Sequence, residues 1–184
     1  FKVSDSSDFC APESRPSITL KFTFLVDDQP FSISIPAAYK WRDPSYGERR
    51  RPLISTPGYT ASFEEQQLLT KSGEPKEVRI KIKNFRDSLN TTLNITAPKG
   101  WTISPNKIHL EFNTMHAEEW FVLTVEAAKD AKSGTVKLSQ EDGTKLFNYK
   151  EITYDHIPTQ ALFRTAFMQC TVLDAKIKAG RIAY

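Results

Sequence analysis

The 184-residue chain has few of the residues that build metal centres and disulfide frameworks. It has two cysteines, Cys10 and Cys170, and three histidines, His109, His116 and His156. The cysteines lie near opposite ends of the chain and fit no C-x-x-C pattern, so they indicate no disulfide framework, and whether they pair stays open. The histidines form no H-x-x-H or H-E-x-x-H motif. We therefore predict no metal-binding residue and interpret His109 and His116 as surface side chains.

Motifs for catalysis and for phosphate binding are also missing. The seven glycines form neither a G-x-S-x-G nucleophile elbow nor a glycine-rich phosphate loop. Pairs of adjacent carboxylates include those at 27–28, 64–65 and 118–119. Adjacent residues on a strand point to opposite faces, so such pairs cannot converge on one bond of a substrate. We predict no catalytic residue and no cofactor site, and the chain by itself is not expected to be an enzyme.

Long apolar runs and a strong charge imbalance are absent as well. The longest apolar runs are a few residues, whereas a membrane helix needs ~20, so no membrane span is predicted. The 25 basic and 22 acidic residues give a net charge of +3, and the basic residues are spread along the chain. This balance is too mild to indicate a nucleic-acid partner.

The dominant pattern that is present is an alternation of apolar and polar residues with a period of two. Apolar residues alternate with polar ones from Ile18 to Val26, and the alternation resumes from Phe31 to Ile35 after the turn residues 27–30. This pattern predicts a β-hairpin with one apolar face. We therefore predict that residues 1–52 hold strands of an upstream, incomplete β-sandwich together with a linker.

A second region of alternation runs from Val78 to Tyr154. Its short apolar segments are separated by turn residues at 98–100, 132–134 and 142–143. Short strands at such intervals are typical of an all-β sandwich or barrel. Residues 53–152 are predicted to form a β-sandwich. The alternation weakens in residues 153–184, which are predicted to be a connector and the start of a following, truncated domain.

The segment from Pro36 to Pro57 differs in composition. Its four prolines argue against a central strand or a long helix, so it is predicted to be an irregular linker between domains. The candidate ligand-binding or domain-interface residues lie in this segment: Trp41, Tyr46, Arg49, Arg50 and Arg51. The arginines can bind an anion or an acidic neighbouring domain. Exposed aromatic rings can stack on a sugar, whereas Trp41 can also pack against its own domain, and both interpretations stay open.

Five blocks of the sequence, taken in order, point to one family. They are Tyr39–Pro44 with Gly47-Glu48 and Arg51-Pro52, Val78–Phe85 with Asp87, Pro98–Trp101 with Ser104-Pro105, Tyr154–Pro158, and Gly180–Tyr184. In their order and spacing these blocks resemble the region that follows the catalytic domain in bacterial LmbE-like (PIG-L) deacetylases. The middle part, about 53–152, also resembles the small immunoglobulin-like sandwich that accompanies glycosidase catalytic domains. The resemblance thus implies an all-β, immunoglobulin-like fold.

The resemblance stops at the catalytic motifs. The metal site of the family uses an A-H-P-D-D motif and a later H-x-x-H, and neither occurs here, so no catalytic or metal-binding residue carries over. The resemblance implies a non-catalytic accessory region that positions neighbouring domains of a larger parent chain. That parent would be a metal-dependent N-acetyl-sugar deacetylase, exported to the cell envelope. The alternative is a carbohydrate-binding module that presents exposed aromatic residues.

Overall fold

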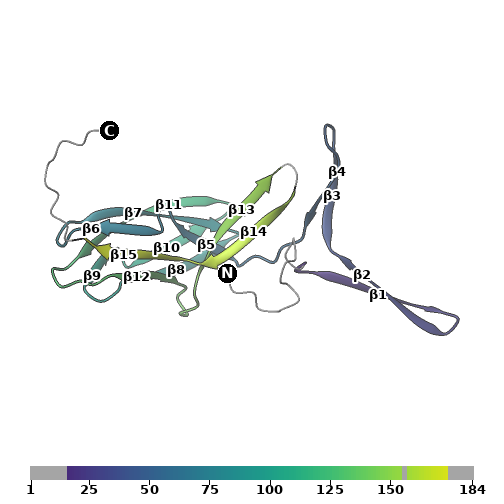
Figure 1. Cartoon of the computed structure of the whole chain (residues 1–184), viewed down its shortest axis with the longest axis horizontal. Coiled ribbons are helices and arrows are strands. Elements are labelled where there is room, and N and C mark those ends of the chain that lie inside the picture. Colours follow the sequence, from purple (N-terminus) through teal and green to yellow (C-terminus); the bar gives the residue numbers. More distant parts are fainter. Residues whose placement is uncertain (1–15, 155–156, 174–184) are drawn as a thin grey trace, which may run out of the picture. The chain divides into compact units, whose positions relative to one another are not determined.

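All regular structure in the described part of the chain is β-strand. The computed structural model describes residues 16–154 and 157–173 (Figure 1). The chain divides into two compact units, one made of residues up to Thr56 with Glu151–Ala161, and one made of Pro57–Lys150 with the residues from Leu162 on. The prediction of an all-β fold is confirmed.

The second unit is a β-sandwich of two sheets. One sheet has four strands, in the order β5 (Tyr59–Phe63), β7 (Lys76–Asn84), β11 (Glu118–Ala127) and β9 (Trp101–Ser104). The other has five, in the order β10 (Lys107–Phe112), β8 (Leu89–Thr96), β12 (Gly134–Ser139), β15 (Phe167–Val172) and β6 (Gln67–Thr70). Neighbouring strands in both sheets pair antiparallel, except for β15 and β6, which pair parallel.

The core of the sandwich comes from the inward-facing residues of both sheets. Alternate residues of β7 and β11 are buried, among them Ile80, Ile82 and Leu123, which are fully buried. The facing sheet contributes Leu93 and Leu110 in the same way. Burying a large aliphatic side chain stabilises a fold by about 1.5–3 kcal/mol, so this period-two pattern both sets the register and holds the sheets together.

The described residues from Leu162 on belong to the same unit as this sandwich. β13 (Phe147–Tyr154) and β14 (Ile157–Thr165) form a two-stranded sheet, and β15 follows directly. Met168 and Cys170 of β15 are fully buried in the core. Residues 157–165 and 167–172 are thus strands, whereas residues 153–184 were predicted to be a connector and the start of a following, truncated domain. Residues 174–184 and His156, like Cys10, lie outside the described residues.

The first unit contains two β-hairpins. β1 (Thr19–Val26) pairs with β2 (Gln29–Pro36), as predicted, with Asp27 and Asp28 in the turn at positive φ. β3 (Ala38–Asp43) pairs with β4 (Gly47–Pro52), in the segment that was predicted to be an irregular linker. Pro36 and Pro52 end strands, Pro44 lies in the turn, and Pro57 lies after the hairpin, so the prolines interrupt no ladder of hydrogen bonds.

Candidate functional site

The register of the β3–β4 hairpin sorts its side chains onto two faces. Trp41 lies opposite Arg49, and Tyr39 lies opposite Arg51. Directly opposed residues of an antiparallel pair share a face, so these four side chains form one surface, which we call the aromatic face. The other face carries only charged or small residues: Ala38, Lys40, Arg42, Glu48, Arg50 and Pro52.

Ring contacts hold side chains of the aromatic face in position. The rings of Tyr39 and Trp41 stack with their centroids 5.7 Å apart and their planes 21° from parallel. The guanidinium carbon of Arg49 lies 4.4 Å from the centroid of Tyr46, a cation–π contact. Tyr39 is 63% exposed and Trp41 is 38% exposed, so both rings are accessible to a ligand. Tyr46 is 63% exposed as well, so the structure leaves both predicted aromatic residues accessible to solvent.

The turn between the strands fixes the position of Tyr46. The backbone N–H groups of Ser45 and Tyr46 both donate to Oδ1 of Asp43, at 2.8 and 3.0 Å. Gly47 follows at φ +77°, a backbone conformation that side chains with a Cβ rarely adopt. The aspartate turn therefore holds the ring that supports Arg49.

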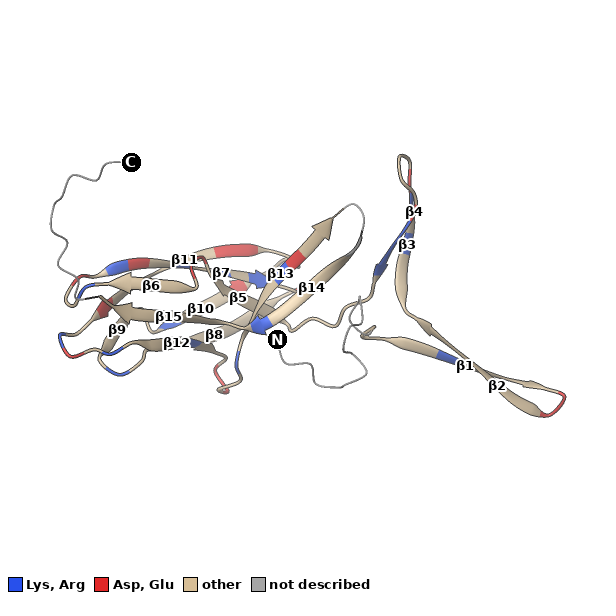
Figure 2. Ribbon diagram, in the orientation of Figure 1, with Lys and Arg blue, Asp and Glu red and all other residues tan. Residues whose placement is uncertain are grey.

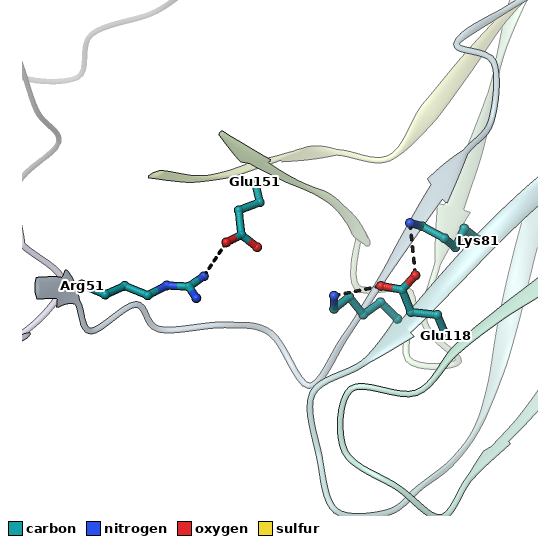
Figure 3. A network of polar contacts seen from close by, with 5 residues as sticks. Arg51, Lys81, Glu118 and Glu151 are labelled. Atoms are coloured by element: carbon teal, nitrogen blue, oxygen red, sulfur yellow. Dashed lines mark hydrogen bonds and ion pairs between the residues drawn. The ribbon is translucent and has the colours of Figure 1, made fainter. Parts of the chain in front are cut away.

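The three arginines have different surroundings. Nη2 of Arg51 lies 2.7 Å from Oε1 of Glu151, which partly neutralises Arg51 (Figure 3). Arg49 is half-buried and forms no ion pair with a carboxylate in residues 16–154 and 157–173. Arg50 is exposed and points to the opposite face of the hairpin. Of the predicted triplet, the structure thus places Arg49 and Arg51 beside the aromatic residues and separates Arg50 from them.

The hairpin has a local excess of positive charge, visible as the blue segments of β3 and β4 in Figure 2. Residues 38–52 contain five basic residues and two acidic ones, Asp43 and Glu48, which gives this segment a net charge of +3. Lys40 pairs with Glu48 at 3.0 Å. An open hollow of about 540 Å³ is lined by Lys40, Trp41, Arg42, Gly47 and Glu48. The arrangement can bind an anionic group next to a flat ring face.

Sequence reasoning missed Tyr39 as a member of this site. The signal for it was the spacing of two residues to Trp41, which places both rings on one face of a strand. That signal was lost because the segment was predicted to have no regular strand. Arg50 was included because it is adjacent to Arg49 in sequence, although adjacent residues on a strand point apart.

A second surface with aromatic and charged side chains lies on the outer face of the four-stranded sheet. Trp120 is 43% exposed, and the guanidinium carbon of Arg79 lies 4.7 Å from its ring centroid. The cations on this surface have carboxylate partners: Glu118 pairs with both Lys81, at 3.3 Å, and Lys83, at 2.8 Å (Figure 3). The hydrogen bond from Lys83 lowers the pKa of Glu118. Because its charges are paired, this face offers less to an anionic ligand than the β3–β4 hairpin.

The described residues hold no group of three or more histidine, cysteine or acidic side chains that could bind a metal. His109 is exposed on β10, and His116 lies in a loop at φ +64°. Among the described residues there is no helix long and apolar enough to cross a membrane.

The β1–β2 hairpin presents an exposed apolar face. Its opposed pairs are Leu20 with Ile35, Phe22 with Ile33, and Phe24 with Phe31. These six side chains are 41–54% exposed. The other face is mainly polar, and the hydroxyl groups of Thr23 and Ser32 lie 3.0 Å apart across it. We call the six side chains the apolar face of the hairpin.

Comparison with known proteins assigns no role to these surfaces. No protein-family model matches the chain, and no curated protein matches it significantly.

Proposed function

We propose that this chain is a non-catalytic accessory region of a larger, deacetylase-family protein, and that it packs against a neighbouring domain of that parent. The observation that carries this proposal is the apolar face of the β1–β2 hairpin. The family of the parent protein is inferred from the sequence blocks that resemble LmbE-like deacetylases. The occupant of the apolar face is an apolar β-sheet surface of the neighbouring domain.

The magnitude of the exposed surface supports this role. A two-stranded hairpin is marginally stable in water by itself. Full burial of a large apolar side chain contributes about 1.5–3 kcal/mol, so burying the remaining half of each of the six contributes roughly 1 kcal/mol apiece, or ~6 kcal/mol in all. Only one face is apolar, so one covering layer is enough. A second β-sheet is the layer that such an amphipathic hairpin ordinarily packs against.

The size of the native protein tests the existence of a parent. An antibody raised against this chain should detect a product several times larger than 20.9 kDa in its source cell. A product near 20.9 kDa would refute the proposal, because no neighbouring domain would then exist in the same chain.

Matched substitutions in that full-length protein test the docking surface. We expect Ile33→Asp to destabilise the parent by roughly 1–3 kcal/mol in thermal or urea unfolding, because it places a charge in the buried interface. Ser34→Asp, on the polar face of the same strand, should change the stability by less than about 0.5 kcal/mol. In the 184-residue chain alone, both substitutions should have similarly small effects. Equal effects of the two substitutions in the parent would contradict docking through the apolar face.

A second candidate function, carbohydrate binding, is favoured by one specific observation. The rings of Tyr39 and Trp41 are exposed and lie on the same face as Arg49. Flat aromatic faces stack on the apolar faces of sugar rings, and neighbouring donors bind the sugar oxygens. This function predicts saccharide affinity that is lost in Trp41→Ala. It requires no catalytic residue in this chain.

A further inference from the structure

We propose that the aromatic face of the β3–β4 hairpin binds saccharides that carry an acidic group, a carboxylate or a sulfate, in preference to neutral ones. This inference rests on the carbohydrate-binding function proposed above and adds the chemical class of the ligand. It is carried by the juxtaposition of Trp41 with Arg49 and by the charge of the hairpin.

The stacking element is the ring pair of Tyr39 and Trp41. The two rings are stacked on each other, with centroids 5.7 Å apart. The space between them is therefore closed, and a ligand ring stacks on an outer surface of the pair. A saccharide needs only one such surface. An unpaired nucleic-acid strand instead places successive bases on successive rings, which this pair does not offer.

Arg49 is the group that recognises the acid. It lies directly opposite Trp41, so the Cβ atoms of the two residues are about 5 Å apart, and a ring on Trp41 brings its substituents near the guanidinium. The guanidinium stacks on Tyr46 with its carbon 4.4 Å from the ring centroid. Such stacking orients the planar fork of donors and leaves its N–H groups to bind a carboxylate or sulfate. Within residues 16–154 and 157–173 no acidic side chain pairs with Arg49.

The other basic residues of the hairpin are less suited to this contact. Arg51 is on the same face but is paired with Glu151 at 2.7 Å. Lys40 is on the opposite face and is paired with Glu48. Arg42 and Arg50 are also on the opposite face. These residues contribute to the net charge of +3 for residues 38–52, which attracts an anion without selecting its position.

Matched ligands and matched variants of the whole 184-residue chain test the proposal. The probes are an oligogalacturonate beside its methyl ester, and a sulfated galactan oligosaccharide beside its desulfated form, titrated by calorimetry at low and physiological salt. We expect at least one acidic probe to bind roughly tenfold or more tightly than its neutral form, because a charge-assisted bidentate contact is about twice as strong as a neutral one. Which of the two acidic probes binds more tightly distinguishes a carboxylate ligand from a sulfate ligand.

The variants separate the contact with the acid from general charge. Arg49→Gln should reduce the affinity for the acidic probe by roughly tenfold and leave the neutral probe almost unchanged. Arg50→Gln removes the same charge from the other face and should reduce the affinity by less than about twofold. Trp41→Ala should abolish binding of both probes. Circular dichroism and the Tm of each variant show whether the hairpin and sandwich remain folded.

The outcomes distinguish the two levels of the proposal. Equal affinity for the acidic and neutral probes would overturn the preference for acids and leave carbohydrate binding supported. No binding of any probe would overturn both. Equal losses in Arg49→Gln and Arg50→Gln would overturn the assignment of Arg49. Tighter binding of a single-stranded oligonucleotide than of either acidic probe would overturn the saccharide class in favour of nucleic acid.

Discussion

The hydrogen bonds of Asn84 are expected to contribute substantially to the free energy of unfolding. This residue, at the end of β7, is fully buried. Its Nδ2 group donates to the backbone oxygens of Arg86, at 2.6 Å, and Thr114, at 2.9 Å. Its Oδ1 accepts from the N–H of Arg86 at 3.0 Å. Asn84 thus connects the two loops that follow β7 and β10.

The cost of Asn84→Ala follows from these three bonds. The substitution leaves one backbone N–H and two backbone oxygens without their side-chain partner. A buried group that loses its partner costs about 1–3 kcal/mol, and the lower end applies here because Arg86 and Thr114 are exposed, which gives water access to these loops. We therefore expect a loss of about 3 kcal/mol in the free energy of unfolding. For a unit of this size such a loss lowers the Tm by roughly 10 °C.

Urea unfolding monitored by tryptophan fluorescence measures this loss, with two comparison variants. Asn94→Ala removes a half-buried amide with a single bond to the Gln140 oxygen at 3.2 Å, and it should cost about 1 kcal/mol or less. Asn84→Asp keeps the acceptor but faces a carboxylate toward two carbonyl oxygens. It should therefore destabilise more at pH 7 than at pH 4. A cost below about 1 kcal/mol for Asn84→Ala, or one equal to that of Asn94→Ala, would refute the reasoning.

Two further predictions concern buried groups of the sandwich. The Tyr59 hydroxyl is buried and has no hydrogen-bond partner among the described residues. Tyr59→Phe should therefore leave the free energy of unfolding unchanged or raise it by up to about 1 kcal/mol. A clear loss of stability in urea unfolding would contradict this. Burial raises the pKa of Cys170 to about 11. The thiol therefore ionises first in the unfolded chain, and the free energy of unfolding should fall as the pH rises from about 9 to 11. Burial also raises the pKa of Tyr59, which acts in the same direction. Cys170→Ala should make the fall shallower, and an unchanged pH profile would count against the assignment.

The sandwich was predictable where strongly apolar residues alternate. The residues from Val78 to Ile82 predicted β7 and its buried face, because a period of two admits one inward face only. Trp101, which follows the turn at Gly100, is buried, and its Nε1 donates to the Lys132 oxygen at 2.9 Å. A tryptophan that enters a strand after a glycine turn more often fills the core than binds a ligand, and Trp101 does so.

β15 shows why the same reasoning failed further along the chain. Its inward residues are Met168 and Cys170, which are neither β-branched nor aromatic, so they carry a weak strand signal. Its partner β6 is parallel and about a hundred residues away in sequence. A parallel pair of this kind is formed by tertiary packing, which no local pattern records. The segment that was predicted to be a connector and the start of a following domain therefore includes an interior strand of the five-stranded sheet.

The candidate site was predictable in composition but not in geometry. The aromatic and basic residues of 39–51 were evident from the sequence, whereas the pairing that sorts them into faces was not. The prolines were weighed by their number, although their positions decide the outcome. Pro36 ends β2, Pro44 lies in the turn and Pro52 ends β4, so each stands where a missing N–H does no harm. Once the hairpin is recognised, the period of two brings Tyr39 into the site and removes Arg50.

The contrast between the two units bears on where function is to be sought. The sandwich buries its apolar residues in its own core, so its stability needs no further layer. The β1–β2 hairpin leaves Phe22, Phe24 and Phe31 about half exposed, although its alternation is as regular as that of β7. An alternation that regular specifies a buried face, and in this hairpin nothing within the described residues buries it. Packing against a partner is therefore expected to stabilise the hairpin itself, so that its folding and its docking are coupled. The hydrogen-exchange protection of β1 and β2 should accordingly rise in the parent protein, while that of β7 stays the same.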